Sequence, residues 1–394
     1  MNTWKKVKIQ DVTTVLGDGL HGTPKYTEDG EYAFVNGNNL VNGKLIIKKD
    51  TKRVDETQYE KYKKPLDERT IMVSINGTLG NVGVYNGEKV ILGKSACYFN
   101  VKEEYDKEFI KYVVSSPVFK NYLENNATGT TIKNISLKQM REYEFDVPSY
   151  ELQRKISRIL KNIDDKIETN QAINRNLLDQ AEAYFNELFV ENAYEEWEEG
   201  TLSDVGTIVA GGTPSKAKEE YYCKNGIAWI TPKDLSQDKS VFISHGEYDI
   251  SDLGYEKSSA TKMPAGTVLF SSRAPIGYIA IATNEVTTNQ GFKSVVPNDN
   301  TGTAYIYFLL KQLLPTIENM ASGSTFKEIS GSAMKIVPTI VPDNETLKKF
   351  NDFCAPILEK IQTLELESKR LVDLRDSLLP KLMSGELDVA ELKI

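Results

Sequence analysis

The sequence predicts a mixed α/β protein in which two pseudo-symmetric globular units are separated by two long antiparallel coiled-coil helices. Three observations lead to this fold class: an internal duplication, strand-like runs in both copies, and a heptad pattern after each copy. The length of 394 residues allows two or three domains at about 150 residues each. With 40% hydrophobic and 26% charged residues, the composition is that of an ordinary globular protein rather than a disordered or fibrous one.

Six segments of the first half recur in the same order in the second half, at offsets of 190 to 197 residues. The strongest match is ATGTTIKNIS at 127–136 against ASGSTFKEIS at 321–330, with six of ten positions identical. The other matches are Trp4 and Asp11-Val12 with Trp197 and Asp204-Val205, Gly22-Thr23-Pro24 with Gly212-Thr213-Pro214, 34–40 with 229–235, 72–84 with 269–281, and Val147-Pro148 with Val341-Pro342. Chance does not preserve order and spacing six times, so the chain is a tandem duplication.

Each globular unit is expected to be mixed α/β. Short apolar runs bounded by Gly, Asn and Pro predict strands, which in the first copy are 33–35, 70–75, 82–85 and 97–101. Helix-spaced apolar residues predict helices at 109–123 and 305–320. Pro117 and Pro315 are expected to interrupt these helices, because proline lacks the N–H that a helix interior needs.

A heptad seam follows each globular unit. Its positions are Ile156, Leu160, Ile163, Ile167, Asn170, Asn174, Leu177, Ala181, Tyr184 and Leu188, and then Phe350, Cys354, Ile357, Ile361, Leu364, Ser368, Leu371, Arg375, Leu378 and Leu382. A helix of roughly 40 residues is about 60 Å long and cannot bury such a stripe alone, so we expect the two helices to pack antiparallel. The alternative is two separate surface helices, each docked on its own unit.

Four residues modify this helical prediction. Pro356 is expected to kink or restart the second helix, and Pro380 is expected to end it. Asn170 and Asn174 place polar side chains near the middle of the first seam, where they would fix register at some cost in stability.

The net charge of −8 argues against a nucleic-acid partner until the chain is divided. Residues 1–150 carry +2, 151–196 carry −4, 197–343 carry −4 and 344–394 carry −2. Part of the acidity therefore lies on helices, whose exposed faces are commonly charged. The composition permits DNA binding, and the second unit would need its cations clustered.

Other classes of protein find little support. Without an apolar run of about 18 residues or a secretory signal, we expect a cytoplasmic protein with no membrane association. Three scattered cysteines and two histidines predict no metal site. The segment from Gly87 to Gly93-Lys94-Ser95 is similar to a phosphate-binding P-loop, but five residues separate its glycines and a strand-like run follows it. A hairpin turn is the better interpretation, and no catalytic constellation is visible.

Polar loops with small residues recur in both copies and are the candidate DNA contacts. Hydroxyls and a lysine beside a glycine suit phosphate oxygens, in Thr130, Thr131 and Lys133 and in Ser324, Thr325 and Lys327. Loops at equivalent places differ in donors and acceptors, as two different half-sites require: Asn36, Asn38 and Asn39 against Thr231, Lys233 and Asp234, and Asn76 and Thr78 against Ser272 and Arg273. The backbone-contacting turns would be Gly22, Thr23 and Lys25, and Gly212, Thr213 and Lys216. Plain turns that satisfy their own backbone are the alternative.

Taken together, the whole chain resembles the specificity (S) subunit of type I restriction-modification enzymes. The motifs are Gly-Thr-Pro early in each copy, the stretch from Phe270 to Gly277, and the segments 129–135 and 323–329, followed by Pro148 and Pro342. The first copy departs from the pattern, because Asn76-Gly77 stands where the second has Ser272-Arg273. The second helix lacks the usual Glu-Gln start.

This resemblance implies a subunit without catalytic activity or a cofactor of its own. Two target recognition domains, 1–150 and 197–343, would each read one half of a split, asymmetric site in double-stranded DNA. The helical spacers, 151–196 and 344–394 with the C-terminal tail, would set the spacing and dock two methyltransferase (M) subunits. S-adenosylmethionine would bind to the M subunits, and ATP would be used by restriction (R) subunits.

Two alternatives remain at this point. A two-headed scaffold for carbohydrate or protein, dimerising through the coiled coil, explains the duplication equally well. A nucleotide-binding protein would use Gly93-Lys94-Ser95.

Overall fold

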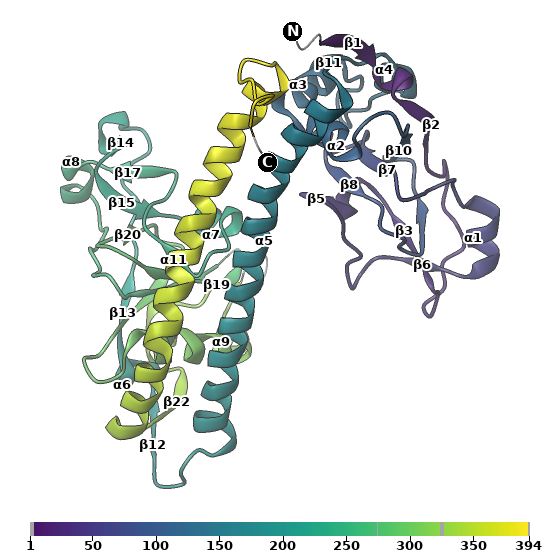
Figure 1. The fold of residues 1–394 in the computed structure, drawn as a ribbon. Helices are drawn as coiled ribbons and strands as arrows, with labels where there is room; N and C mark the ends of the chain where they lie inside the picture. The colour runs from purple at the N-terminus through teal and green to yellow at the C-terminus, as the bar shows by residue number, and fades with distance from the viewer. Residues whose placement is uncertain (1–3, 274, 324–326, 393–394) are drawn as a thin grey trace. The chain divides into compact units, whose positions relative to one another are not determined.

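The computed structural model describes residues 4–273, 275–323 and 327–392. It contains two compact units: unit 1 comprises residues 1–166 and 370–394, and unit 2 comprises residues 167–369. Each unit therefore includes a segment of both long helices, whose ribbons are labelled α5 and α11 in Figure 1. The predicted domain boundaries at 150, 196 and 343 give each long helix a segment of its own, whereas the two compact units divide both helices. These boundaries stay a prediction.

Unit 1 contains eleven of the described strands, four short helices and two 3-10 turns, followed by the start of α5. They are β1 Lys5–Lys8, η1 Ile9–Asp11, β2 Thr13–Asp18, β3 Tyr32–Val35, η2 Gly37–Asn39, β4 Leu40–Val41, β5 Gly43–Leu45, β6 Arg53–Val54, α1 Glu56–Tyr62, β7 Thr70–Ser74, β8 Val82–Val84, β9 Val90–Leu92, β10 Ala96–Val101, α2 Lys107–Ser115, α3 Pro117–Asn126, α4 Leu137–Glu142, β11 Glu144–Val147 and α5 Tyr150–Asn186.

Unit 2 repeats this order with different insertions. After a π-helical turn, η3 Glu187–Glu191, come β12 Glu198–Thr201, α6 Leu202–Val205, β13 Gly206–Ala210, η4 Glu219–Tyr221, β14 Tyr222–Cys223, β15 Ile227–Ile230, α7 Pro232–Gln237, β16 Phe242–Ile243, β17 Tyr248–Ile250, α8 Asp252–Glu256, β18 Val268–Ser272, β19 Ile276–Ala282, β20 Thr287–Thr288, β21 Lys293–Pro297, α9 Thr303–Met320, α10 Gly331–Lys335, β22 Pro338–Val341 and α11 Asn344–Met383.

The main sheets of the two units share five strands in equivalent order, to which unit 1 adds β4, and the second sheets have three strands in unit 1 and four in unit 2. The main sheet has the order β2-β10-β7-β8-β5-β4 in unit 1 and β13-β21-β18-β19-β16 in unit 2. A second sheet has a parallel pair in each unit, β3 with β9 and β15 with β20. A third, two-stranded sheet joins β1 to β11 and β12 to β22. The predicted mixed α/β class and pseudo-symmetry are thereby confirmed.

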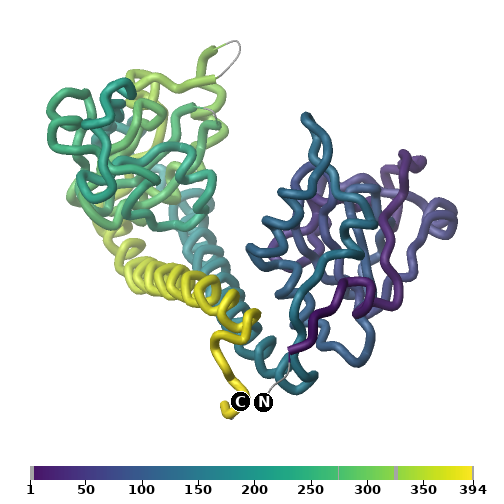
Figure 2. The backbone as a smooth tube through the Cα atoms, turned by 90° about the horizontal axis from the view of Figure 1, so that it is seen from above, coloured from purple at the N-terminus to yellow at the C-terminus, as the bar shows by residue number. Residues whose placement is uncertain are grey.

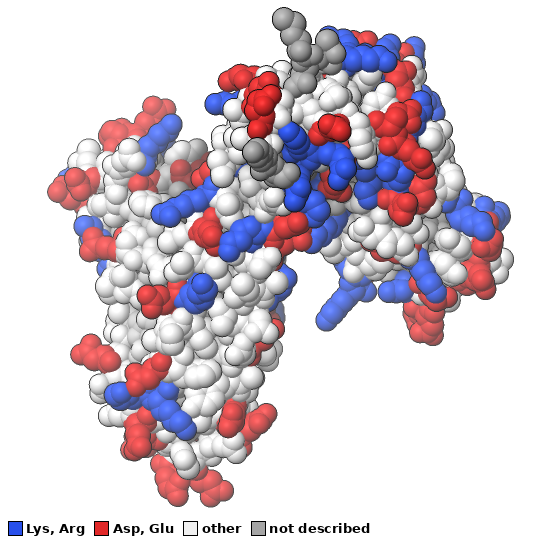
Figure 3. All heavy atoms as spheres, in the orientation of Figure 1, with Lys and Arg blue, Asp and Glu red and all other residues white. Residues whose placement is uncertain are grey.

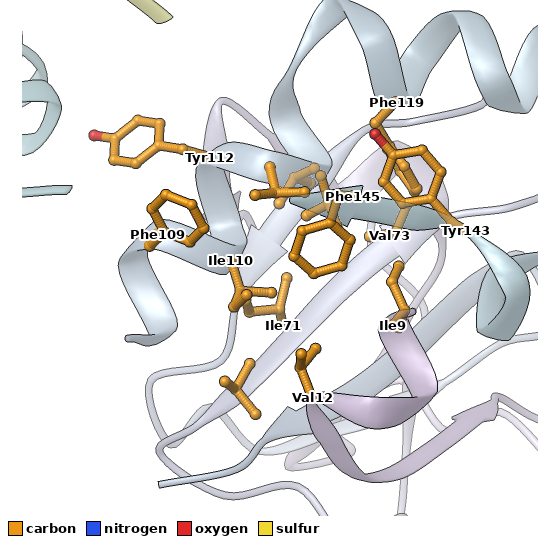
Figure 4. Close-up of a cluster of buried hydrophobic side chains, with 14 of the residues drawn as sticks. Ile9, Val12, Ile71, Val73, Phe109, Ile110, Tyr112, Phe119, Tyr143 and Phe145 are labelled. Atoms are coloured by element: carbon orange, nitrogen blue, oxygen red, sulfur yellow. The ribbon is translucent and has the colours of Figure 1, made fainter. Parts of the chain in front are cut away.

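The core of unit 1 lies between its main sheet and helices α2 and α3. Every residue of β7 is buried, which is consistent with the apolar Ile71-Met72-Val73 at its centre. Ile71 and Val73 of this strand pack in one cluster with Phe109 and Ile110 of α2 (Figure 4). Since β7 is fixed in this core, the loop that leaves it at Ser74 starts from a rigid position.

The two long helices pack against each other through the predicted seam. All twenty seam positions are buried or half-buried. In unit 2, Asn170 hydrogen-bonds Ser368, and further along the helix the Tyr184 ring lies 4.5 Å from that of Phe353. Because residue numbers rise along one helix as they fall along the other, the helices are antiparallel, and the alternative of two unpaired surface helices is wrong.

Three of the four prolines that were predicted to interrupt or end a helix lie inside a continuous helix. Pro117 separates α2 from α3 as predicted, because it occupies the first turn of α3, where its missing N–H costs nothing. Pro315, Pro356 and Pro380 lie inside continuous helices, so the predicted interruption at Pro315, restart at Pro356 and helix end at Pro380 are wrong. The alternative of a kink at Pro356 stays a prediction. A proline inside a helix costs about 3 kcal/mol. Buried side chains on both sides of Pro356, such as Cys354 and Ile361, offset this cost.

Both ends of the described chain lie in unit 1, and Figure 2 shows the yellow C-terminal tail that follows α11. A side chain at Gly385 would come within 2.8 Å of Nε1 of Trp4. Lys155 of α5 donates to the carbonyl of Ala390. The C-terminal tail is therefore packed into unit 1.

Candidate nucleic-acid interface

In unit 1, two of the predicted loops lie together. The loop after β7 and the loop between α3 and α4 form a short antiparallel bridge between Asn76 and Asn134. Asn76 Nδ2 donates to Asn134 Oδ1 over 3.2 Å, and the Gly77 amide donates to the carbonyl of Lys133 over 3.0 Å. A predicted base-reading residue and a predicted phosphate loop therefore belong to one surface.

Unit 2 builds the same arrangement from different side chains. Arg273 follows β18 and bridges to Glu328, as Asn76 does to Asn134. An Arg273 Nη atom lies 3.3 Å from a carboxylate oxygen of Glu328, whose other oxygen lies 3.7 Å from Nζ of Lys293. Burial lowers the pKa of Lys293, although Glu328 opposes this effect. A charged cluster thus stands where unit 1 has two amides.

The predicted phosphate loop of unit 1 is exposed. Thr130, Thr131 and Lys133 are all exposed, and Ile132 between them has 59% of its surface in solvent. Gly129 turns the chain with a φ of +96°, and a side chain there would meet the Ile132 carbonyl at 2.3 Å. This loop presents hydroxyls, a cation and an apolar side chain outward. In unit 2, Lys327 is exposed, and Ser324 and Thr325 lie outside the described residues.

The second pair of predicted reading loops consists largely of capping contacts. Asn39 Oδ1 accepts the backbone N–H of Asn36 over 3.0 Å, and Asp234 Oδ2 accepts that of Thr231 over 2.7 Å. Both capping residues are buried, at 4% and 8% exposed. Their burial does not favour base reading by Asn39 and Asp234, because their acceptors already serve the backbone, and that role stays a prediction.

The neighbours of these capping residues remain candidates. Asn38 is exposed, and Asn36 is half-buried and accepts a hydrogen bond from Ser95 over 2.9 Å. Lys233 is exposed, with its ammonium 2.5 Å from Glu247.

Ser272 is fully buried, which does not favour the predicted contact of its side chain with DNA. Its Oγ has no hydrogen-bond partner in the described part of the chain. Its backbone, in contrast, ties two loops together, since it donates to Gly291 over 2.8 Å and accepts from Ile329 over 3.1 Å. Thr78, at the equivalent loop of unit 1, is exposed.

The two Gly-Thr-Pro turns differ in their surroundings. Gly22, Thr23 and Lys25 are exposed. Gly212 is buried, accepts the indole N–H of Trp229 over 3.0 Å, and has the Ala260 nitrogen 2.4 Å from where a Cβ would stand. Gly212 is thus required for close packing, and its predicted role as a DNA contact is not supported by its position.

A hollow of about 740 Å³ in unit 2 brings five predicted residues together. They are Thr213, Lys216, Thr231, Lys233 and Asp234. Trp229, Tyr222 and Tyr248 supply aromatic walls, and Asn289 and Gln290 supply amides. The sequence prediction did not include any of these aromatic residues or amides.

A hollow of about 580 Å³ in unit 1 contains Asn76 and Asn134 together with Lys94, His21 and Asp18. His21 Nε2 lies 2.5 Å from the Asp18 carboxylate. Lys94 is exposed and precedes β10, which confirms the predicted strand after the P-loop-like segment. The hairpin interpretation is wrong, because β9 pairs with β3 and not with β8.

The turn that contains Lys94 has a counterpart in unit 2, and sequence reasoning missed both as parts of the interface. Gly93 donates to Val35 over 2.8 Å, and Asn289 donates to Ile230 over 3.0 Å. Ile75 donates to Ser95 over 2.9 Å, as Ser272 does to Gly291. These turns therefore connect the reading loops in both units. The sequence contains the Gly93-Lys94-Ser95 motif, but its similarity to a phosphate-binding loop does not indicate a turn that connects the reading loops.

Comparison with known proteins decides the family. The family model described as type I restriction modification DNA specificity domain matches residues 1–178 and 194–373, one match for each copy of the duplication. The chain belongs to this type I DNA specificity family.

Individual relatives agree with this assignment. The chain is 37% identical to the type I restriction enzyme MjaIX specificity subunit of Methanocaldococcus jannaschii over 207 residues, which are 49% of this chain and 48% of that protein. It is 26% identical to the HindI specificity subunit of Haemophilus influenzae, over 65% of this chain and 72% of the relative. The first match thus spans about half of the relative's length.

A solved structure supports the fold of this specificity-family chain. The S subunit of a type I restriction-modification system from M. genitalium matches with a TM-score of 0.61 and 22% identity, over 97% of this chain and 96% of that one.

Each unit has exposed lysines among the residues of its candidate DNA-contacting loops and the turns beside them. In unit 1 they are Lys25, Lys94 and Lys133, and in unit 2 Lys216, Lys233 and Lys327. On the face shown in Figure 3, charges of both signs are interspersed over unit 1, and wide uncharged areas occur over unit 2.

Among residues 4–273, 275–323 and 327–392, no cluster of three or more His, Cys, Asp and Glu side chains is arranged to hold a metal. None of the helices in the same ranges combines the length and apolar character needed to cross a membrane.

Proposed function

We propose that this chain gives a type I restriction-modification complex its DNA sequence specificity, with each unit reading one half of a bipartite, asymmetric site in double-stranded DNA. One observation carries the proposal. The same loop framework occurs twice, with an amide pair at Asn76 and Asn134 and a charged pair at Arg273 and Glu328. Equivalent frameworks with different donors and acceptors are suited to two different half-sites.

The exposed loop residues suit contacts with the DNA backbone. Thr130, Thr131 and Lys133 offer hydroxyls and a cation, and Lys94 adds a second cation from the neighbouring turn. Such contacts orient a protein on the duplex without reading its sequence. The loop residues that differ between unit 1 and unit 2 would contact the base edges.

The helices would act as the spacer and as the docking surface for two methyltransferase subunits, with restriction subunits joining that complex. We place no catalytic step and no cofactor on this chain: S-adenosylmethionine would bind to the methyltransferase subunits and ATP to the restriction subunits. The family match, to a type I restriction modification DNA specificity domain, supports the specificity role alone.

A footprint tests the proposal. With the methyltransferase partner present, the chain is expected to protect two short blocks of a DNA duplex, separated by a stretch whose sequence is indifferent. A single continuous protected block would contradict reading by two units.

The alternative of a two-headed carbohydrate-binding scaffold has one observation in its favour, the aromatic hollow of unit 2 with Trp229, Tyr248 and Gln290. Salt separates the two functions. DNA affinity falls steeply as salt rises, because bound cations release counterions from the phosphates. Affinity for a neutral sugar would change little.

A further inference from the structure

We propose that Glu328 and Asn134 are positioning residues for base reading. Glu328 fixes Arg273 for the edge of a guanine. Asn134 fixes Asn76 for the edge of an adenine. This inference rests on the proposed function and deepens it, because it names the base that each pair of loops selects.

The backbone places the two pairs at equivalent positions. Ile135 donates to the carbonyl of Ile75 over 2.9 Å, and Ile329 donates to that of Ser272 over 3.1 Å. In each unit the next residue, Asn76 or Arg273, then bridges to the residue before that isoleucine. The two frameworks thus hold different side chains in the same register.

In unit 2, the charges favour an acceptor-rich base edge. Two cations, Arg273 and Lys293, share the single carboxylate of Glu328. The cluster keeps a positive charge, and the five N–H donors of a guanidinium are not exhausted by one carboxylate contact. Guanine presents two acceptors, O6 and N7, in the major groove, and a bidentate arginine matches them.

In unit 1, the Asn76 amide turns its nitrogen toward Asn134. Asn76 Nδ2 donates to Asn134 Oδ1 over 3.2 Å, which leaves Oδ1 of Asn76 on the other side of the amide. The amide then has an acceptor and a second N–H for a partner. Adenine presents a donor at N6 and an acceptor at N7, which this pair matches.

Stability does not account for the charged pair. Arg273 and Glu328 are 37% and 38% exposed, and ion pairs at such positions add little to folding. Replacing Glu328 by glutamine removes the charge but keeps a polar side chain of the same size beside Lys293, so the protein is expected to stay folded while Arg273 loses its carboxylate partner. A side chain that must be ordered on binding reads its base less selectively than one already held in place.

The test is selection of DNA from a pool of synthetic duplexes with a randomised centre, by the full chain with its methyltransferase partner. Glu328→Gln and Arg273→Lys test unit 2, and Asn134→Ala tests unit 1. Glu285→Gln is the matched control for Glu328→Gln, because Glu285 also forms an exposed ion pair, with Lys262 at 2.9 Å, and its loss changes the net charge equally. Asn86→Ala, at an exposed asparagine, is the control for unit 1.

Both unit 2 variants are expected to lower the preference for guanine at one position of one block by about tenfold, and to leave the other block unchanged. Asn134→Ala should lower the preference for adenine at one position of the other block. The controls should enrich the wild-type sequence.

Unchanged base preferences in Glu328→Gln and Asn134→Ala, beside a wild-type chain that enriches two blocks, overturn the inference and leave the proposed function standing. A wild-type chain that enriches no sequence overturns the proposed function, and the inference with it.

Discussion

At the scale of single residues, short polar side chains at turns serve either the backbone or a ligand. Asn39 and Asp234 stand in equivalent loops, and both accept the amide of the residue three positions earlier. The neighbouring Asn38 and Lys233 point into solvent. Since Asn and Asp suit both capping and base reading, residue type alone does not separate the two roles. The burial of the side chain separates them.

Replacing Asp234 by alanine is expected to lower stability by about 1 to 3 kcal/mol, because a nearly buried carboxylate that serves three donors is lost. It accepts two hydrogen bonds from Thr231, at 2.7 and 2.6 Å, and one from the amide of Glu247 at 2.9 Å. Thermal unfolding followed by circular dichroism measures the effect, with Asp299→Ala at an exposed position as the control. Equal unfolding temperatures for the two variants would refute the capping role.

Asp343, immediately before α11, is expected to make stability depend on pH. The backbone N–H of Thr346, at 2.8 Å, holds the pKa of the Asp343 carboxyl below its ordinary value of 3.8, although burial opposes this effect. A depressed pKa in the folded state means that the stabilisation is present above that ordinary value and is lost as pH falls through the folded pKa.

The wild-type chain should therefore lose more stability than Asp343→Asn between about pH 5 and about pH 3. Denaturant unfolding at a series of pH values measures this difference. If the free energy of unfolding changed with pH equally in the two proteins, the charge on Asp343 would have no part in the pH dependence of stability.

At the scale of elements, the heptad pattern proved more informative than the prolines. The pattern identified both seams of α5 and α11, because burial of a stripe requires a periodic sequence. The effect of a proline depends on its neighbours. Pro356 costs the helix one hydrogen bond, whereas the buried side chains around it hold both of its sides in the helix.

Asn170→Leu is expected to raise the free energy of unfolding by about 1 kcal/mol, because an apolar seam is more stable than one with an unsatisfied amide. Asn170 is fully buried, and its Oδ1 has no hydrogen-bond partner among the described residues. Its Nδ2 donates to Glu367 over 2.8 Å and to Ser368 over 3.3 Å. Denaturant unfolding checks the change, and a clear loss of stability would show that these two contacts outweigh the buried oxygen.

At the scale of the whole molecule, the duplication extends to the order of the strands. Both units place the strands of the main sheet in the same sequence, and both bring equivalent loops together beside it. Each unit also includes a part of both long helices. Folding of one unit therefore needs residues from both halves of the chain.

Inserting four residues in α5 is expected to change the length of the indifferent DNA spacer and to leave both half-sites intact. Four helical residues add about 6 Å along a helix axis, which corresponds to about two base pairs of duplex at 3.4 Å each. Selection from randomised duplexes measures the spacer of the variant. Altered bases within the half-sites would count against a ruler function for the helices.

The sequence by itself determined the duplication, the mixed α/β class and the two antiparallel helices, because these depend on repeated segments and on periodic burial along the chain. It also located the loops that carry Asn76 and Arg273. Only the tertiary structure decided which polar residues of those loops face solvent, since Ser272, Asn39 and Asp234 have the same chemistry as a DNA contact and are buried. It also paired Arg273 with Glu328 and Asn76 with Asn134. The physical reason is that these partners lie more than fifty residues apart in the chain, and strands of the sheet bring them together.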